Sequence, residues 1–382
     1  MKIRDTSLVK KKFGFANYSV FNSNSGYNEL HLTITPNSYN LNESFERIIF
    51  DYENVLKKEN LSKDSLFFSR IHFDNKDMDV KLITDFIKKL SLKPCSVIQQ
   101  PPLTGKICFY SWHIYSKKEK IFHLTDNNEV FIQGKNYDLL FNSGIKSKKN
   151  NVYLQTKDIF NQFNKRLKNR KMNFNNNFVR SWIYVADIDE NYESMVKARK
   201  DFFYKQGLKN FFPASTGIGC LSSDNSYVNA DFFSVNRIKK EQIVPISSRL
   251  MPKPTLYGVT FERGLEIIFG DRKHIYISGT ASIGKKGEVL YPDNVEKQTK
   301  VIVKNIKDLL LSCNSSLNDI AQMNVYLRNK DDYEKVKKII DVEFLKNTPY
   351  LILQGAVCRK DWLVEIDAIA IKSIKSKFPV LL

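Results

Sequence analysis

The C-terminal half of the chain shows the clearest alternation of apolar and polar positions. Runs rich in β-branched residues predict strands, and an apolar stripe through Ile302, Ile306 and Leu309 predicts an amphipathic helix. In chain order the pattern predicts strands at 265–269 and 274–283, a helix at 295–312, a strand at 320–327, a helix at 331–344, and strands at 350–358 and 362–371. This order predicts one mixed sheet with two helices on one face.

The N-terminal half is harder to interpret, and its first 60 residues are the least readable. The pattern predicts a strand at 66–73, a helix at 80–92 and a strand at 106–115. Two Lys- and Asn-rich stretches, 142–151 and 166–177, predict surface loops. No period of 20–50 residues repeats, so solenoids and propellers are not expected. With a domain boundary near the second stretch, we expect an α/β (α+β) protein of two domains, 1–175 and 176–382, each with a mixed sheet covered on one face by helices.

The last predicted strand separates small apolar side chains from carboxylates. Alternation places Val364, Ile366 and Ala368 on one face, which suits helix packing, and Glu365 and Asp367 on the other. The two carboxylates therefore lie on the sheet face that the helices do not cover. From the pattern alone, a solvent-exposed strand face and a functional site are both open interpretations.

Composition narrows the functional classes. The chain has 382 residues with 42% hydrophobic and 26% charged residues, which is typical of a folded protein, and a formal net charge of +19. Nucleic-acid binding is one interpretation of this surplus. Because the lysines are spread along the chain and no nucleic-acid-binding motif is present, a solvated basic surface is the favoured interpretation. A positive field also attracts a small dianionic substrate.

Cysteine and histidine usage predicts neither disulfides nor a metal site. The five cysteines are odd in number and lack CxxC spacing, and the five histidines are scattered. The first residues lack the apolar run of a signal peptide, and no stretch of about 18 apolar residues predicts a membrane span. We therefore expect a cytoplasmic protein without a membrane partner.

Several segments in a specific order resemble the chorismatase family. They are VIQQPPLTGK near residue 100, RSWIYVADI, FFPASTGIG, YGVTFERG, HIYISGTASIGKKGE, QMNVYLRNKDDY and AVCRKDWLVEIDAIAI, and together they run from about Val97 to Lys372. The resemblance implies a C-terminal catalytic domain with a core similar to the small reactive-intermediate deaminases. It also implies a monomer that acts on chorismate without metal or other cofactor and without a nucleic-acid partner.

Chorismate is a dianion with a ring carboxylate and an enolpyruvyl ether, and its cleavage requires a general acid at the ether methylene. Glu365 occupies the family's catalytic glutamate position, and burial against an apolar ring would raise its pKa enough for it to donate a proton. Cys358 lies seven residues earlier, across the turn. Family members with a cysteine there resemble those that release 3-hydroxybenzoate. Members without it tend to release a dihydroxycyclohexadiene acid, which is the alternative product.

The resemblance and the chemistry of carboxylate binding together suggest the substrate-binding residues. Guanidinium groups suit bidentate carboxylate capture, hydroxyl groups supply neutral donors, and a glycine leaves room for the ring. The expected residues are Arg263 and Arg328, with Arg180 and Arg359 as further candidates, together with Tyr257, Thr216 and Gly279.

The alternative functions are an imine or enamine deaminase of the small-protein family and a catalytically silent binding protein. The deaminases carry an arginine two residues after a proline to hold a carboxylate, whereas this chain has Leu351 after Pro349. The chain is also about three times as long as those proteins. The intact Glu365 and Arg263 weigh against a silent member.

Overall fold

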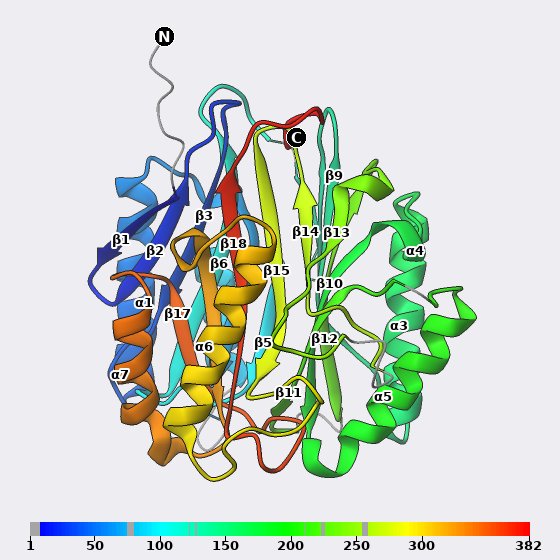
Figure 1. Ribbon diagram of the computed structural model, residues 1–382. Helices are drawn as coiled ribbons and strands as arrows, with labels where there is room; N and C mark the ends of the chain where they lie inside the picture. The colour runs from blue at the N-terminus through cyan, green and yellow to red at the C-terminus, as the bar shows by residue number, and fades with distance from the viewer. Residues whose placement is uncertain are drawn as a thin grey trace.

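The computed structural model describes residues 8–74, 80–121, 123–126, 128–209, 211–222, 226–253 and 259–382. These residues form three six-stranded sheets with helices on the outside (Figure 1). The first sheet has the order β1-β2-β3-β6-β4-β5. Its strands and helices, in chain order, are β1 (Leu8–Phe13), β2 (Ala16–Phe21), β3 (Tyr27–Ile34), α1 (Leu41–Lys58), β4 (Leu66–Phe73), α2 (Val80–Leu90), β5 (Cys95–Gln99) and β6 (Ile107–Ser116).

The second and third sheets repeat this strand order, as β7-β8-β9-β12-β10-β11 and β13-β14-β15-β18-β16-β17. The second comprises β7 (His123–Thr125), β8 (Glu129–Gln133), β9 (Asp138–Lys146), α3 (Val152–Asn169), α4 (Phe174–Asn177), β10 (Phe178–Ala186), α5 (Ile188–Lys205), β11 (Ala214–Cys220) and β12 (Val228–Asn236). The third comprises β13 (Ile243–Pro245), β14 (Gly264–Ile268), β15 (Arg272–Ala281), α6 (Val295–Ser312), β16 (Ile320–Leu327), α7 (Tyr333–Glu343), β17 (Tyr350–Gln354) and β18 (Val364–Ser373). In each sheet the last listed pair of neighbours is parallel.

The chain is thus built from three sheet units of one topology, and the expected division into two domains needs correction. The boundary at residue 175 falls inside the second sheet, because β9 before it pairs with β12 after it. The 166–177 stretch that indicated a linker is instead the end of α3 followed by α4. Its Lys residues and most of its Asn residues are exposed, while Leu167, Phe174 and Asn177 are buried.

The other expected loop is also partly a strand. Residues 142–146 belong to β9, and Asn142 is buried, where it donates a hydrogen bond of 2.9 Å to Glu129. Asn142 is opposite Glu129 of β8, and Arg170 of α3 also binds Glu129, so protein groups replace water as the partners of these buried polar side chains. In the third sheet, by contrast, the predicted order of elements is confirmed, with 295–312 and 320–327 matching α6 and β16, although the strand predicted at 350–358 ends at Gln354.

The sheets turn their helix-free faces toward one another. In β18, Val364, Ile366 and Ala368 belong to the apolar core together with Ile302 and Ile306 of α6, as the pattern predicts. The opposite face is not exposed, because Glu365 and Asp367 are only 5% and 2% accessible. The two carboxylates are therefore buried between sheets, which is the interpretation that alternation alone left open.

Three buried ion pairs connect the three sheets, one for each pair of sheets. Arg70 of β4 binds Asp231 of β12 at 2.6 Å, Arg180 of β10 lies 3.4 Å from Asp367 of β18, and Arg272 of β15 binds Glu29 of β3 at 2.7 Å. A charge buried without its partner is costly, so these pairs favour one relative placement of the sheets.

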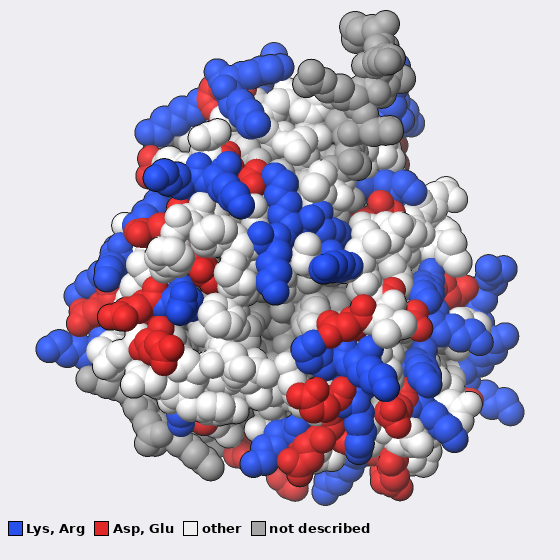
Figure 2. Space-filling model, turned by 90° about the vertical axis from the view of Figure 1, so that its left-hand side faces the viewer, with Lys and Arg blue, Asp and Glu red and all other residues white. Residues whose placement is uncertain are grey.

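On the face drawn in Figure 2, basic side chains predominate above and side chains of both signs are interspersed below. Among the described residues, no helix is both long enough and apolar enough to cross a membrane.

Candidate functional site

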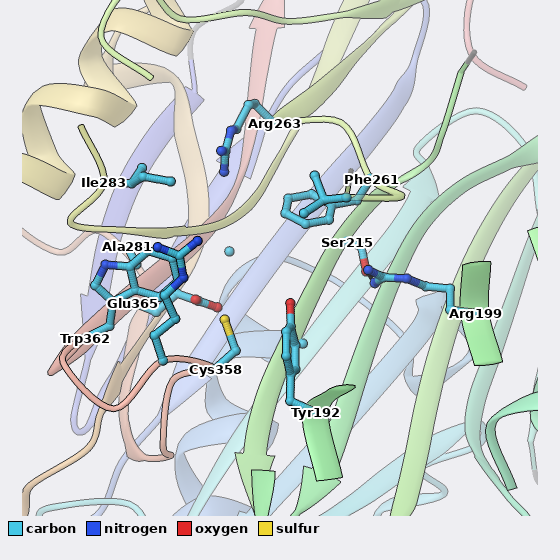
Figure 3. A pocket seen from close by; sticks show the side chains of 14 residues that line it. Tyr192, Arg199, Ser215, Phe261, Arg263, Ala281, Ile283, Cys358, Trp362 and Glu365 are labelled. Carbon is cyan, nitrogen blue, oxygen red and sulfur yellow. Dashed lines mark hydrogen bonds between the residues drawn. The ribbon is translucent and has the colours of Figure 1, made fainter. Parts of the chain in front are cut away.

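A pocket of about 220 Å³ lies where the second and third sheets meet. The second sheet contributes α5 and β11, and the third contributes β15, β18 and the 355–363 loop between β17 and β18. The lining residues are Tyr192, Arg199, Ser215, Gly217, Val259, Phe261, Arg263, Gly279, Ala281, Ile283, Cys358, Arg359, Trp362 and Glu365. Figure 3 shows Arg263 and Tyr192 reaching into this space from opposite sides, with the Glu365 carboxyl and the Cys358 sulfur between them.

Glu365 lies in the pocket as a protonated acid at neutral pH. Burial and, after it, the nearby Asp367 raise its pKa, Arg180 and Arg263 lower it, and the net result is a pKa of about 8. A carboxyl with this pKa carries its proton at pH 7 and releases it at little cost, which is the requirement for a general acid. The alternation that separated Glu365 from the helix face thus directs it into a cavity.

Gly279 gives space to the carboxyl group rather than to a ligand ring alone. A Cβ atom at this position would lie 2.8 Å from the Glu365 carboxyl carbon and 3.2 Å from Thr216 Cγ2. The pairing of β15 with β18 shifts register between Ile277 and Thr280, which places Gly279 in the irregular segment. Any larger residue would therefore displace the Glu365 side chain.

Cys358 lies beside Glu365 as a neutral thiol. Burial and the proximity of Glu365 raise its pKa to about 12, and the Tyr192 hydroxyl of α5 is its hydrogen-bonding partner. Because a thiol with this pKa stays protonated at neutral pH, Cys358 can donate a proton but is not a thiolate nucleophile.

Two of the expected arginines line the pocket. Arg263 is 5% exposed, and its guanidinium carbon lies 5.8 Å from the centre of the Phe261 ring. Arg359 is exposed at the rim, where it donates a 2.8 Å hydrogen bond to the Gly287 carbonyl and stacks over Trp362 at 4.5 Å. Cations at these positions favour an anionic ligand.

Sequence reasoning missed a third arginine, Arg199 of α5. It is 2% exposed and donates to Thr260 and Ser215, and its Nη2 atom has no hydrogen-bond partner among the described residues. A signal was present, because Arg199 lies seven residues after Tyr192 and four after Met195, on the buried stripe of an amphipathic helix. An arginine on such a stripe needs a partner inside the protein or in a ligand.

Thr216 and Arg180 lie beneath the pocket and do not line it. The Thr216 hydroxyl donates to Asp367 at 2.8 Å and accepts from Arg180 at 2.6 Å and from the Gly279 amide at 3.1 Å. Asp367 also accepts a 3.0 Å bond from Asn324. This network holds β11 against β18 and fixes the backbone under Glu365.

The structure does not bring Arg328 into the pocket. Arg328 lies outside it, in a neighbouring cavity, with its guanidinium engaged by Asp189 and by backbone carbonyls. Tyr257 lies outside the described residues. The side chains that complete the pocket instead are Phe261, Ile283 and Trp362, which make an apolar slot between the proton donors and the arginines.

This arrangement suits a small ring-containing anion. The apolar slot accepts a flat ring, the arginines on different sides can hold separate carboxylates, and Glu365 and Cys358 offer two protons from neutral groups. No three His, Cys, Asp or Glu side chains are grouped to hold a metal ion within the described part of the chain.

Comparisons with known proteins identify relatives of the third sheet unit. The family described as endoribonuclease L-PSP matches residues 268–372. A RutC family protein of Pyrococcus horikoshii is 30% identical over 99 residues, which cover 26% of this chain and 79% of the archaeal protein.

Two further relatives extend beyond that unit. A 3-hydroxybenzoate synthase of Streptomyces hygroscopicus is 24% identical over 214 residues, which cover 50% of this chain and 62% of the relative. The crystal structure of a chorismatase superposes with a TM-score of 0.62 at 17% identity, covering 80% of this chain and 93% of the other. The second likeness shows a common fold.

Proposed function

Because this chain belongs to the RutC family through its third sheet unit and has the fold of a chorismatase, we propose that it cleaves chorismate to pyruvate and 3-hydroxybenzoate. The observation that carries the proposal is the buried Glu365, whose pKa of about 8 provides a proton donor in an arginine-lined apolar pocket. The similarity to a 3-hydroxybenzoate synthase supports the choice of substrate and product.

The reaction begins with protonation of the enol-ether methylene by Glu365. The ether carbon becomes an oxocarbenium ion, and the neighbouring ring hydroxyl attacks the ring carbon that bears the ether. The ether bond breaks with its electron pair on the departing oxygen, so that pyruvate leaves. The hydroxyl proton returns to Glu365, and a ring oxide remains. Arg199 on one side and Arg263 and Arg359 on the other would hold the two carboxylates.

Cys358 acts in the second half of the proposed reaction. Its neutral thiol donates a proton to the oxygen of the ring oxide as the ring opens, and loss of the ring proton restores the thiol and makes the product aromatic. No water is consumed along this route. If water attacked the ring carbon instead, the product would be a dihydroxycyclohexadiene acid, which is the alternative product.

The direct test is incubation of the purified protein with chorismate. We expect one pyruvate and one aromatic acid for each chorismate consumed, without added metal or nucleotide. Pyruvate is measured with a coupled dehydrogenase, and the acid is identified by chromatography against standards. A rate of pyruvate formation equal to the spontaneous rate would reject the proposal.

Arg263→Lys is expected to raise KM for chorismate by about tenfold or more. Lysine keeps the charge but loses the planar fork, and a charge-assisted hydrogen bond contributes roughly 1.5–3 kcal/mol. Arg249→Lys is the matched control, because the Arg249 side chain is 87% exposed outside the pocket. Equal KM values for both variants would move the carboxylate site away from Arg263.

Cys358→Ala is expected to keep pyruvate release and to shift the product mixture away from 3-hydroxybenzoate. The alanine removes the proton donor for ring-oxide opening and leaves Glu365 in place. Chromatography of the quenched reaction gives the product ratio. An unchanged ratio would return Cys358 to the role of a buried packing residue.

A further inference from the structure

Arg328, which follows β16, contacts two parts of the pocket wall from outside. Its guanidinium binds Asp189 in the first turn of α5 through two hydrogen bonds, of 2.8 and 3.1 Å. The same group donates to carbonyls of the 355–363 loop, at 3.2 Å to Trp362 and 3.1 Å to Arg359, and also to Val357. One side chain thus joins α5 of the second sheet unit to a loop of the third.

Both parts that Arg328 joins carry residues of the pocket. The loop carries Cys358, Arg359 and Trp362, while α5 carries Tyr192 and Arg199. The hydrogen bond between Tyr192 and Cys358 therefore depends on the distance between α5 and the loop.

The loop also forms hydrogen bonds with residues of its own, third, sheet unit. Gln298 of α6 donates to the Asp361 carbonyl at 2.7 Å and accepts from the Leu363 amide at 2.9 Å, and the Trp362 indole donates to the Ser282 carbonyl at 3.0 Å. One backbone hydrogen bond, from Gly219 of β11 to Ala356 at 2.8 Å, reaches the second unit at the start of the loop. Near Cys358, the loop is joined to α5 by the Tyr192–Cys358 hydrogen bond and by the contacts of Arg328.

The chemistry of arginine suits this position. Its planar fork presents five donors, so it can bind a carboxylate with two and still donate to carbonyls with others. The side chains of Arg328 and Asp189 are 15% and 30% exposed, and the pair is therefore partly shielded from water. The hydrogen bond from Arg328 lowers the pKa of Asp189, so this carboxyl group is ionised at neutral pH.

We propose that the Arg328–Asp189 pair is a latch that holds the 355–363 loop against α5 and so positions Cys358 beside Glu365. Arg328 is then a positioning residue that does not touch the substrate. The hydrogen bonds of Arg328 are the evidence for the latch, and only the effect of the latch on catalysis rests on the proposed function.

The test of the latch needs no substrate. Burial holds the pKa of Cys358 at about 12, so an aromatic disulfide reagent reacts slowly with it in the wild type. In Asp189→Asn, we expect Cys358 to be labelled about tenfold faster or more, because opening of the loop exposes the thiol. Mass spectrometry of peptides gives the rate at each cysteine, with Cys95 of the first sheet, which is half-buried like Cys358, as the internal reference.

Arg328→Lys provides a second variant that keeps the charge but cannot bridge the carboxylate and the carbonyls, and we expect it to accelerate labelling of Cys358 as well. Glu343→Gln is the matched control, because it removes the exposed Lys307–Glu343 pair of 2.6 Å on α6 and α7. Labelling of Cys358 at the wild-type rate in both latch variants would overturn the proposal. Equal acceleration at Cys95 would also overturn it, since that pattern indicates general loosening.

The catalytic consequence is measured separately with chorismate. We expect Asp189→Asn and Arg328→Lys to shift the product ratio in the same direction as Cys358→Ala and, like it, to keep pyruvate release. If Cys358 is labelled faster in these variants but the product ratio is unchanged, the Arg328–Asp189 pair has a structural role only, and the positioning claim is overturned. If the wild type does not act on chorismate while labelling still accelerates, the proposed function fails and the latch stands.

Discussion

Replacing Glu365 by glutamine is expected to remove nearly all turnover of chorismate while the fold is retained. The amide has the shape of the carboxyl group but cannot deliver its proton, and general acid catalysis contributes about 10²–10⁴-fold. Steady-state pyruvate release measures the loss. A folded variant with more than about a third of the wild-type kcat would exclude Glu365 as the acid.

The pH dependence gives this prediction a second readout. Burial raises the pKa of Glu365 from 4.5 to about 8, and the protonated form is the active one, so wild-type activity is expected to be level below about pH 8 and to fall above it. The same raised pKa favours the protonated folded state, so the stability that it contributes is lost as the pH rises from 4.5 to about 8. Glu365→Gln lacks this loss, and its unfolding curves against pH distinguish a lost proton from a lost fold.

Replacing Arg70 by methionine is expected to destabilise the protein by about 3–5 kcal/mol, because it leaves the carboxylate of Asp231 buried without its cation. Arg70 and Asp231 have side chains only 2% and 0% exposed, and they connect the first and second sheets at 2.6 Å. Methionine keeps most of the aliphatic volume against Phe68 and Trp182, over whose rings the guanidinium lies. Urea unfolding measures the change in free energy.

Two comparisons isolate the charge effect from the packing effect. Arg70→Met combined with Asp231→Leu is expected to recover much of the loss, since neither charge remains buried. Lys63→Met removes the exposed Lys63–Glu53 pair of 2.9 Å and is expected to cost less than about 1 kcal/mol. A loss below about 1 kcal/mol in Arg70→Met would show that the sheets do not depend on this pair.

The sequence by itself determined the local elements of the third sheet unit and the direction of its key side chains. A strand alternates its faces and a helix repeats every 3.6 residues, so the stretch from 265 to 371 predicts its own strands and helices. The same rule places Glu365 and Asp367 on the side opposite the helices. The role of Glu365 as an acid came from the family resemblance, and it remains a proposal that the raised pKa supports.

In the first half of the chain, the same reasoning wrongly predicted surface loops for the polar stretches 142–151 and 166–177. Residues 142–146 contain few apolar side chains, yet they form part of β9 because the partners of Asn142 come from another strand of the sheet. Residues 166–177 continue α3 and form α4 with only a few buried apolar side chains. Local polarity predicts exposure to water, and it fails where other parts of the protein replace water as the hydrogen-bonding partner.

Only the tertiary structure decided how the three sheet units pack together. That packing determines which residues line the pocket. Arg199 and Tyr192 come from a helix more than 150 residues before Glu365 in the chain, and no local pattern encodes that meeting. Gly279 gives space to a carboxyl group that reaches it from another strand, and Arg328 points away from the pocket toward Asp189. Periodicity fixes which face of an element a residue occupies, whereas the packing of sheets that are distant in sequence decides what that face contacts.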